Sequence, residues 1–157
     1  MTTEAGGTQA VWAYTEHEHR DLVRGINHLH DVACAIGRRP TPELSVQVLD
    51  VLRWMDGTLE PHIAWEEAWL YPEIDARTGT PWATRAARFD HRQIREMAER
   101  LRTDQHSLSQ HAEDPRAEMR CHLFGLEALL RAHIEREERF LIPLLDDDRR
   151  PAAPDAR

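Results

Sequence analysis

The sequence predicts an all-α protein, an antiparallel up-down four-helix bundle built from two repeated helical hairpins. Four long segments have the hydrophobic spacing of helices and are separated by short links that contain proline or glycine. No window shows the period-two alternation of a strand. A pair of sequence motifs also occurs twice, once in each half of the chain. Helices of about 25 to 33 residues with short links favour antiparallel neighbours in a bundle.

The first two helices are bounded by glycine and proline. Helix one is expected over residues 11–36, because Gly37 and the link Arg-Arg-Pro-Thr-Pro follow it. Thr41 and Pro42 have the arrangement of an N-cap and a first-turn proline. The second helix is therefore expected to begin there and to continue to about Ile74.

The same signals open the last two helices. Thr80 and Pro81 precede a segment that is expected to be helical over residues 82–110. Asp114 and the proline after it open another helix, which is expected to end near Leu145. The predicted domains are a flexible N-terminus over 1–10, the bundle over 11–147 and a flexible C-terminal tail over 148–157.

Three prolines fall within the second and fourth helical segments. Pro61 lacks the N–H that an α-helix bonds to the carbonyl four residues back, so a bend is expected just before His62. Pro72 and Pro143 are expected to kink or end the second and fourth helices.

The repeat pairs histidines and glutamates at matched positions. HIAWEEAWLYPEID, from His62, can be laid over HIEREERFLIPLLD, from His133. EHRDL, which contains His19, matches DHRQI, which contains His91. Each half of the chain therefore carries one histidine on its first helix and an HxxxE motif on its second helix.

Helical geometry allows these side chains to meet. Residues four apart project from one face of a helix, so His62 with Glu66, and His133 with Glu137, can each grip one metal ion. Antiparallel order then brings all four histidines to the same end of the bundle. Burying two carboxylates there would cost free energy unless their negative charge were compensated, and metal cations supply that compensation. A bundle with a vestigial, metal-free duplication is the structural alternative.

The order His, HxxxE, His, HxxxE, with the continuations EEAWLYP and EERFLIP, resembles the hemerythrin-like (HHE cation-binding) domain from about Val11 to Leu145. The resemblance implies a four-helix bundle around a non-haem di-iron site, with an oxo or hydroxo group and the carboxylates of Glu66 and Glu137 bridging the irons. Imidazole and carboxylate also suit iron on chemical grounds, although manganese and zinc remain open. The implied metal ligands are His19, His62, Glu66, His91, His133 and Glu137.

One position departs from the oxygen carriers of this family. They place a further histidine four residues after the third one, where this chain has Arg95. Fewer protein ligands leave more coordination positions for water and exogenous ligands, which favours redox reactivity over reversible oxygen carriage. Arg95 lies on the same helical face as His91, where it could pair with a ligand carboxylate or steady a bound peroxide as a catalytic residue. The alternative is a surface arginine that reaches water.

Other histidines have structural interpretations. His30 and His122 are expected to share one core layer as a buried, hydrogen-bonded pair, with proton transfer or a second metal as the alternative. His17 and His28 project away from His19, so both are expected to face solvent.

Two glutamates and two cysteines are also assigned structural roles. Glu67 and Glu138 lie about 140° around their helices from the ligand histidines, so positions flanking the site or on the surface are expected rather than ligation. Cys34 and Cys121 are expected to be buried, reduced thiols.

Composition narrows the classes of partner. The chain has 157 residues, a formal net charge of -8 and no block of lysine and arginine, so neither nucleic acid nor an anionic membrane is expected as a partner. No apolar run is long enough to span a bilayer and no signal peptide is visible, so a cytoplasmic protein is expected, monomeric or weakly homo-oligomeric.

The resemblance supports two functions from different classes. The first is a di-iron oxidoreductase that reacts with hydrogen peroxide, nitric oxide or O2 and protects against oxidative or nitrosative stress. The second is a protein that binds or senses oxygen or iron without turnover. A role in iron–sulfur repair is a third, although relatives with that role usually carry an extra N-terminal segment.

Overall fold

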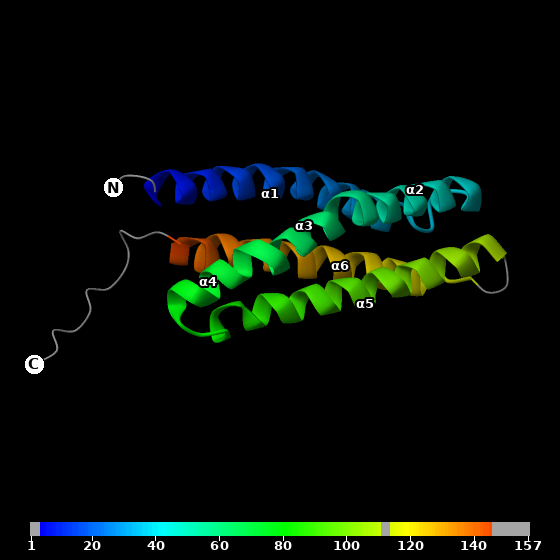
Figure 1. Ribbon diagram of the computed structural model, residues 1–157. Coiled ribbons are helices and arrows are strands. Elements are labelled where there is room, and N and C mark those ends of the chain that lie inside the picture. Colours follow the sequence, from blue (N-terminus) through cyan, green and yellow to red (C-terminus); the bar gives the residue numbers. More distant parts are fainter. Residues whose placement is uncertain (1–3, 111–113, 146–157) are drawn as a thin grey trace, which may run out of the picture.

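Four helical rods pack side by side as a bundle in the computed structural model, which describes residues 4–110 and 114–145 (Figure 1). The fourth rod packs against the first and the third, and the second rod also contacts both of these. The prediction of an all-α four-helix bundle is therefore confirmed. The rods are α1 (Glu4–Ala35); α2 (Thr41–Trp54), η1 (Met55–Leu59), α3 (Glu60–Trp65), η2 (Glu66–Leu70) and α4 (Tyr71–Thr78); α5 (Trp82–Gln110); and α6 (Arg116–Arg136), η3 (Glu137–Leu141) and η4 (Ile142–Leu145).

The helix boundaries lie close to those predicted from proline, glycine and capping residues, with two extensions. Helix α5 spans the predicted residues 82–110. Helix α1 begins at Glu4 rather than Val11, because a helix that is already nucleated extends cheaply even through a segment without apolar periodicity. The second rod continues past Ile74 to Thr78. The predicted C-terminal tail, 148–157, lies outside the described residues.

One predicted cap is confirmed and another is wrong. The hydroxyl of Thr80 accepts a hydrogen bond from the N–H of Trp82 at 3.2 Å, as an N-cap does. Thr41 is instead the first helical residue of α2, and its hydroxyl accepts a hydrogen bond from Arg116 at 2.6 Å. The capping position belongs to Pro40, which has no side-chain donor or acceptor to offer.

Each of the three prolines inside the rods follows a π turn. Proline cannot bond to the carbonyl four residues back and its ring crowds that carbonyl, so the helix widens ahead of it. The residue before each proline donates its N–H to the carbonyl five residues back, which joins Glu60 to Met55, Tyr71 to Glu66, and Ile142 to Glu137. The distortion expected near these prolines is therefore a local π turn in a continuous rod. Two of the three turns begin at Glu66 and Glu137, and π turns are frequent at functional sites.

A polar layer separates two apolar clusters in the core. The larger cluster fills the part of the bundle where Ile26, Val48, Leu101 and Leu126 pack together. The predicted ligands lie at the boundary between the two clusters. On every rod they follow or precede residues of the larger cluster and lie nearer to the end of the bundle that holds the second cluster. This second, smaller cluster consists of Leu70, Tyr71, Ile74, Ala87, Leu141 and Leu145.

The surface of the described residues bears on two further expectations. None of the helices in ranges 4–110 and 114–145 combines the length and the apolar composition that crossing a membrane requires. The expectation of two buried thiols is wrong, because Cys121 is exposed and Cys34 is only partly covered. Both cysteines are free thiols.

Candidate metal centre

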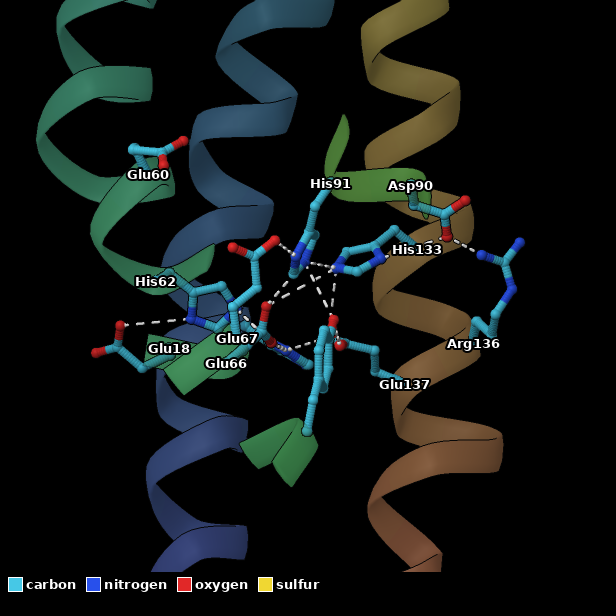
Figure 2. Close-up of polar contacts among 12 residues, drawn as sticks. Glu18, Glu60, His62, Glu66, Glu67, Asp90, His91, His133, Arg136 and Glu137 are labelled. Carbon is cyan, nitrogen blue, oxygen red and sulfur yellow. Dashed lines mark hydrogen bonds and ion pairs between the residues drawn. The ribbon is translucent and has the colours of Figure 1, made fainter. Parts of the chain in front are cut away.

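The six predicted ligands converge in the polar layer from all four rods. His62, Glu66, His91, His133 and Glu137 point toward one small volume between the helices (Figure 2). Their ligand atoms, with those of the sixth residue, form two groups in which all atoms lie within 4.8 Å of one another. The first group is His19, His62, Glu66 and Glu137, and the second is Glu66, His91, His133 and Glu137. Two histidine pairs therefore share the same two carboxylates, as a dinuclear site requires.

Glu66 occupies the centre of this arrangement. One or other of its carboxylate oxygens lies 2.9 Å from Nε2 of His62, 3.2 Å from Nε2 of His91, and 3.9 Å from Nε2 of both His19 and His133. Glu137 lies 3.4 Å from Nε2 of His19 and 3.6 Å from Nε2 of His133. All four imidazoles thus turn the same ring nitrogen inward.

The residues of this site fit metal ions better than they fit one another. All six are buried, and both glutamates are 0% exposed. Burying polar atoms without partners is costly, so an array of them aimed at one volume is the arrangement that suits a bound cation. The buried atoms without a hydrogen-bond partner among the described residues include Nε2 of His19, both ring nitrogens of His62, both carboxylate oxygens of Glu66, Nδ1 of His133 and Oε2 of Glu137.

In the absence of cations, protons compensate the buried carboxylates. Burial by itself would lower the pKa of His19, but the carboxylates of Glu137 and Glu66 outweigh burial and raise this pKa to about 10. The same competition, with Glu66 as the main partner, raises the pKa of His133. Burial would raise the pKa of Glu66, yet the surrounding histidines hold it well below its usual value. The site is therefore built for ionised carboxylates beside positive charge.

Arg95 does not reach the shared carboxylates. Its guanidinium contacts Oε1 of Glu67 at 3.0 Å and Oε1 of Glu60 at 2.7 Å. Glu67 in turn lies 2.9 Å from Nδ1 of His91, and because a carboxylate can only accept, the ring donates this hydrogen bond. The expected contact of Arg95 with a ligand carboxylate is corrected to a chain from Arg95 through Glu67 to His91. The side chain of Arg95 is 38% exposed, so the alternative of an arginine at the surface is also partly realised.

Every histidine of the site faces a carboxylate on its outer side. Glu67 serves His91, as expected of a flanking residue, and Asp90 lies 3.5 Å from Nδ1 of His133. Glu138 lies 3.1 Å from Nδ1 of His19, and Glu18 lies 3.8 Å from Nδ1 of His62. Each of these four residues adjoins a predicted ligand in the sequence, but faces a histidine on another rod. We call Glu18, Glu67, Asp90 and Glu138 the outer carboxylates.

Tyr71 is a member of the site that the sequence interpretation missed. Its side chain is fully buried, and its hydroxyl donates a hydrogen bond to Oε1 of Glu137 at 2.5 Å. The hydroxyl oxygen of Tyr71 also lies 3.1 Å from Nε2 of His91, and the phenol stacks on that ring. Burial and the negative charges of Glu137 and Glu66 raise the pKa of Tyr71, so the phenol keeps its proton. The aligned residue of the second half is Ile142, and this break in the repeat was the available signal.

The other histidines are placed by carboxylates. His30 is bonded through Nδ1 to Glu127 at 2.8 Å, and His122 through Nδ1 to Asp104 at 2.5 Å. The expected buried pair of His30 and His122 is therefore wrong, since each ring has a carboxylate partner and the side chain of His30 is 46% exposed. His17 is exposed, as is His28, in agreement with the prediction.

Fold and site together define a class, the four-helix bundles that carry a candidate dinuclear cation site of histidines and shared glutamates in their core. The family model described as "Hemerythrin HHE cation binding domain" matches residues 11–145, and the chain belongs to this family. No curated protein and no solved structure matched the chain in the same comparisons.

Proposed function

We propose that this protein binds two non-haem iron ions and reacts with hydrogen peroxide, nitric oxide or O2, as an oxidoreductase in protection against oxidative or nitrosative stress. The observation that carries the proposal is the pair of overlapping histidine and glutamate groups that share Glu66 and Glu137. Membership of a cation-binding family supports the presence of metal, and the mixture of imidazole and carboxylate favours iron over metals that prefer thiolates.

The proposed ligand set assigns two imidazoles to each ion. His19 and His62 would hold one ion, and His91 and His133 the other, with Glu66 and Glu137 shared between them. Sites with two histidines and a carboxylate leave open positions at iron, where small exogenous molecules bind. When bound, the irons would supply paired one-electron redox steps.

The protein side chains would hold and orient this centre. Glu66 and Glu137 are fully buried, so water reaches them poorly and reactants have to be small. Tyr71 would fix one oxygen of Glu137 through its hydrogen bond and leave the other oxygen free for metal. Glu138 and Glu67 would hold the rings of His19 and His91 with Nε2 inward through their bonds to Nδ1.

The alternative is a protein that binds or senses oxygen or iron without turnover, or that serves in iron–sulfur repair. It would use the same six ligands. The observation that favours reaction is Arg95, which occupies the position of a further histidine in the oxygen carriers and is engaged with Glu60 and Glu67.

Iron content and rapid kinetics test the proposal. Purified protein is expected to hold about two irons per chain, with a near-ultraviolet ligand-to-metal charge-transfer band that is lost in His62→Ala and Glu137→Ala. The exposed His28 provides the matched control, because His28→Ala should keep both the iron and the band. Stopped-flow mixing with peroxide, nitric oxide and O2 then separates turnover from reversible binding. Protein that takes up no metal, or variants with unchanged iron content, would refute the site.

A further inference from the structure

The outer carboxylates divide into two pairs that differ in charge. Glu67 is held by Arg95. Asp90 forms an ion pair with Arg136 (Figure 2). Glu67 accepts a hydrogen bond from Nδ1 of His91 at 2.9 Å, and Asp90 lies 3.5 Å from Nδ1 of His133. These two histidines belong to one metal group.

The other pair serves the second group. Glu138 faces His19, and Glu18 faces His62. Neither is in contact with an arginine among the residues that the structure describes, and their side chains are 52% and 30% exposed, respectively. The sequence repeat makes the six metal ligands of the two halves equivalent, but it does not extend to the arginines that pair with the outer carboxylates.

We propose that Arg95 and Arg136 make the two metal positions unequal, so that the position at His19 and His62 binds a divalent cation more tightly than the position at His91 and His133. This inference rests on the proposed function, because it concerns the metals that the six ligands would hold. Arg95 and Arg136 are positioning residues in this scheme, since their guanidinium groups act through Glu67 and Asp90.

The physical cause is the basicity of the histidines. A carboxylate that accepts the Nδ1–H of an imidazole makes Nε2 a stronger donor to a metal. A guanidinium paired with that carboxylate withdraws part of its negative charge, so the imidazole behind it gains less. The arginine also adds a positive charge near the cation, and the burial of the site limits how far water screens this repulsion.

The two arginines are not equally placed to exert this effect. The Asp90 side chain is 10% exposed and that of Arg136 is 36% exposed, and Asp90 makes no hydrogen bond to Nδ1 of His133, so Arg136 acts mainly through its charge. The guanidinium of Arg95 pairs with both Glu67 and the half-exposed Glu60, so its positive charge is shared between two carboxylates. Glu67 accepts the Nδ1–H of His91 at 2.9 Å, so neutralising Arg95 should still change the affinity of the weaker position.

Cobalt(II) titration of the metal-free protein tests the inference. Calorimetry and the visible bands of bound cobalt should resolve two binding steps whose affinities differ by about tenfold or more, the scale on which partners of metal-bound histidines act. His62→Ala should abolish the tighter step, and His133→Ala the weaker one. Arg95→Gln and Arg136→Gln should strengthen the weaker step and reduce the difference between the two affinities.

Two controls separate charge from anchoring. Arg95→Lys keeps the positive charge and should leave the difference close to that of the unaltered protein. Arg92→Gln removes a charge from the same helix at an exposed residue that stacks over Phe89, and it should leave both steps unchanged.

The outcomes are distinguishable. Two steps of equal affinity, the reverse order in the histidine variants, or a weaker second step in Arg95→Gln and Arg136→Gln would overturn the inference while leaving a two-metal site in place. Failure to bind cobalt at all, or binding that survives both histidine substitutions, would instead overturn the proposed function.

Discussion

Tyr71→Phe isolates one hydrogen bond within the site. The phenol is fully buried and donates to Glu137 at 2.5 Å, and phenylalanine keeps the ring and its packing while removing the donor. A hydrogen bond to a charged group contributes about 1.5 to 3 kcal/mol, and the carboxylate left behind is 0% exposed. We expect the free energy of unfolding of the metal-free protein to fall by about 2 kcal/mol.

Thermal unfolding followed by circular dichroism measures this loss. For a chain of this size, about 2 kcal/mol corresponds to a fall in Tm of roughly 4 to 8 °C. The loss should be smaller in metal-loaded protein, because a cation would then compensate Glu137. Ile142→Val, at the aligned position of the other half, removes one methylene without touching a polar group, so it controls for packing and should cost about 1 kcal/mol with or without metal. A change below about 0.5 kcal/mol in metal-free Tyr71→Phe would show that Glu137 does not depend on this donor.

Three further predictions concern pH, protons and packing. The pKa of His19 is raised from 6.5 to about 10 in the metal-free protein, so the stability it contributes is present below pH 6.5 and is lost as the pH rises through 10. The free energy of unfolding in urea should therefore be highest at pH 6, lower at pH 8 and lowest at pH 10. Metal binding at pH 7 should release protons, because His19 and His133 have raised pKa values, and calorimetry in buffers of different ionisation enthalpy counts them; no release would contradict protonated histidines. Gly25→Ala would place a Cβ 1.9 Å from the ring of Trp54 and should destabilise the protein by about 1 to 3 kcal/mol in chemical unfolding, whereas Gly57→Ala meets nothing within 4 Å and should not.

Much of the site could be predicted because helical geometry relates sequence spacing to direction. His62 and Glu66 project from one face whatever the rest of the chain does, and the repeat supplied the second pair independently. The start of α5 was predicted for a similar reason, since Thr80 and Pro81 act within one turn of the helix they begin.

The parts that were missed depend on contacts between rods. The helical positions of His30 and His122 placed them on the faces of His19 and His133, but could not show that the side chain of His30 would be 46% exposed or that Glu127 and Asp104 would be the partners. Asp90 escaped attention because its partner His133 is on a different rod. Its position directly before His91 was a usable sign, shared with Glu18 before His19.

The polar layer between the two apolar clusters has a consequence for local opening. The smaller cluster has six residues and holds the end of the bundle where α4 turns into α5. Without cations, this polar layer interrupts the apolar packing between the two clusters, so the amides at this end should exchange with solvent faster than those around Leu101. Bound metals would link all four rods at that level and slow the exchange. Hydrogen exchange around Ile74 and Ala87 would then report metal occupancy from a part of the chain that contributes no ligand.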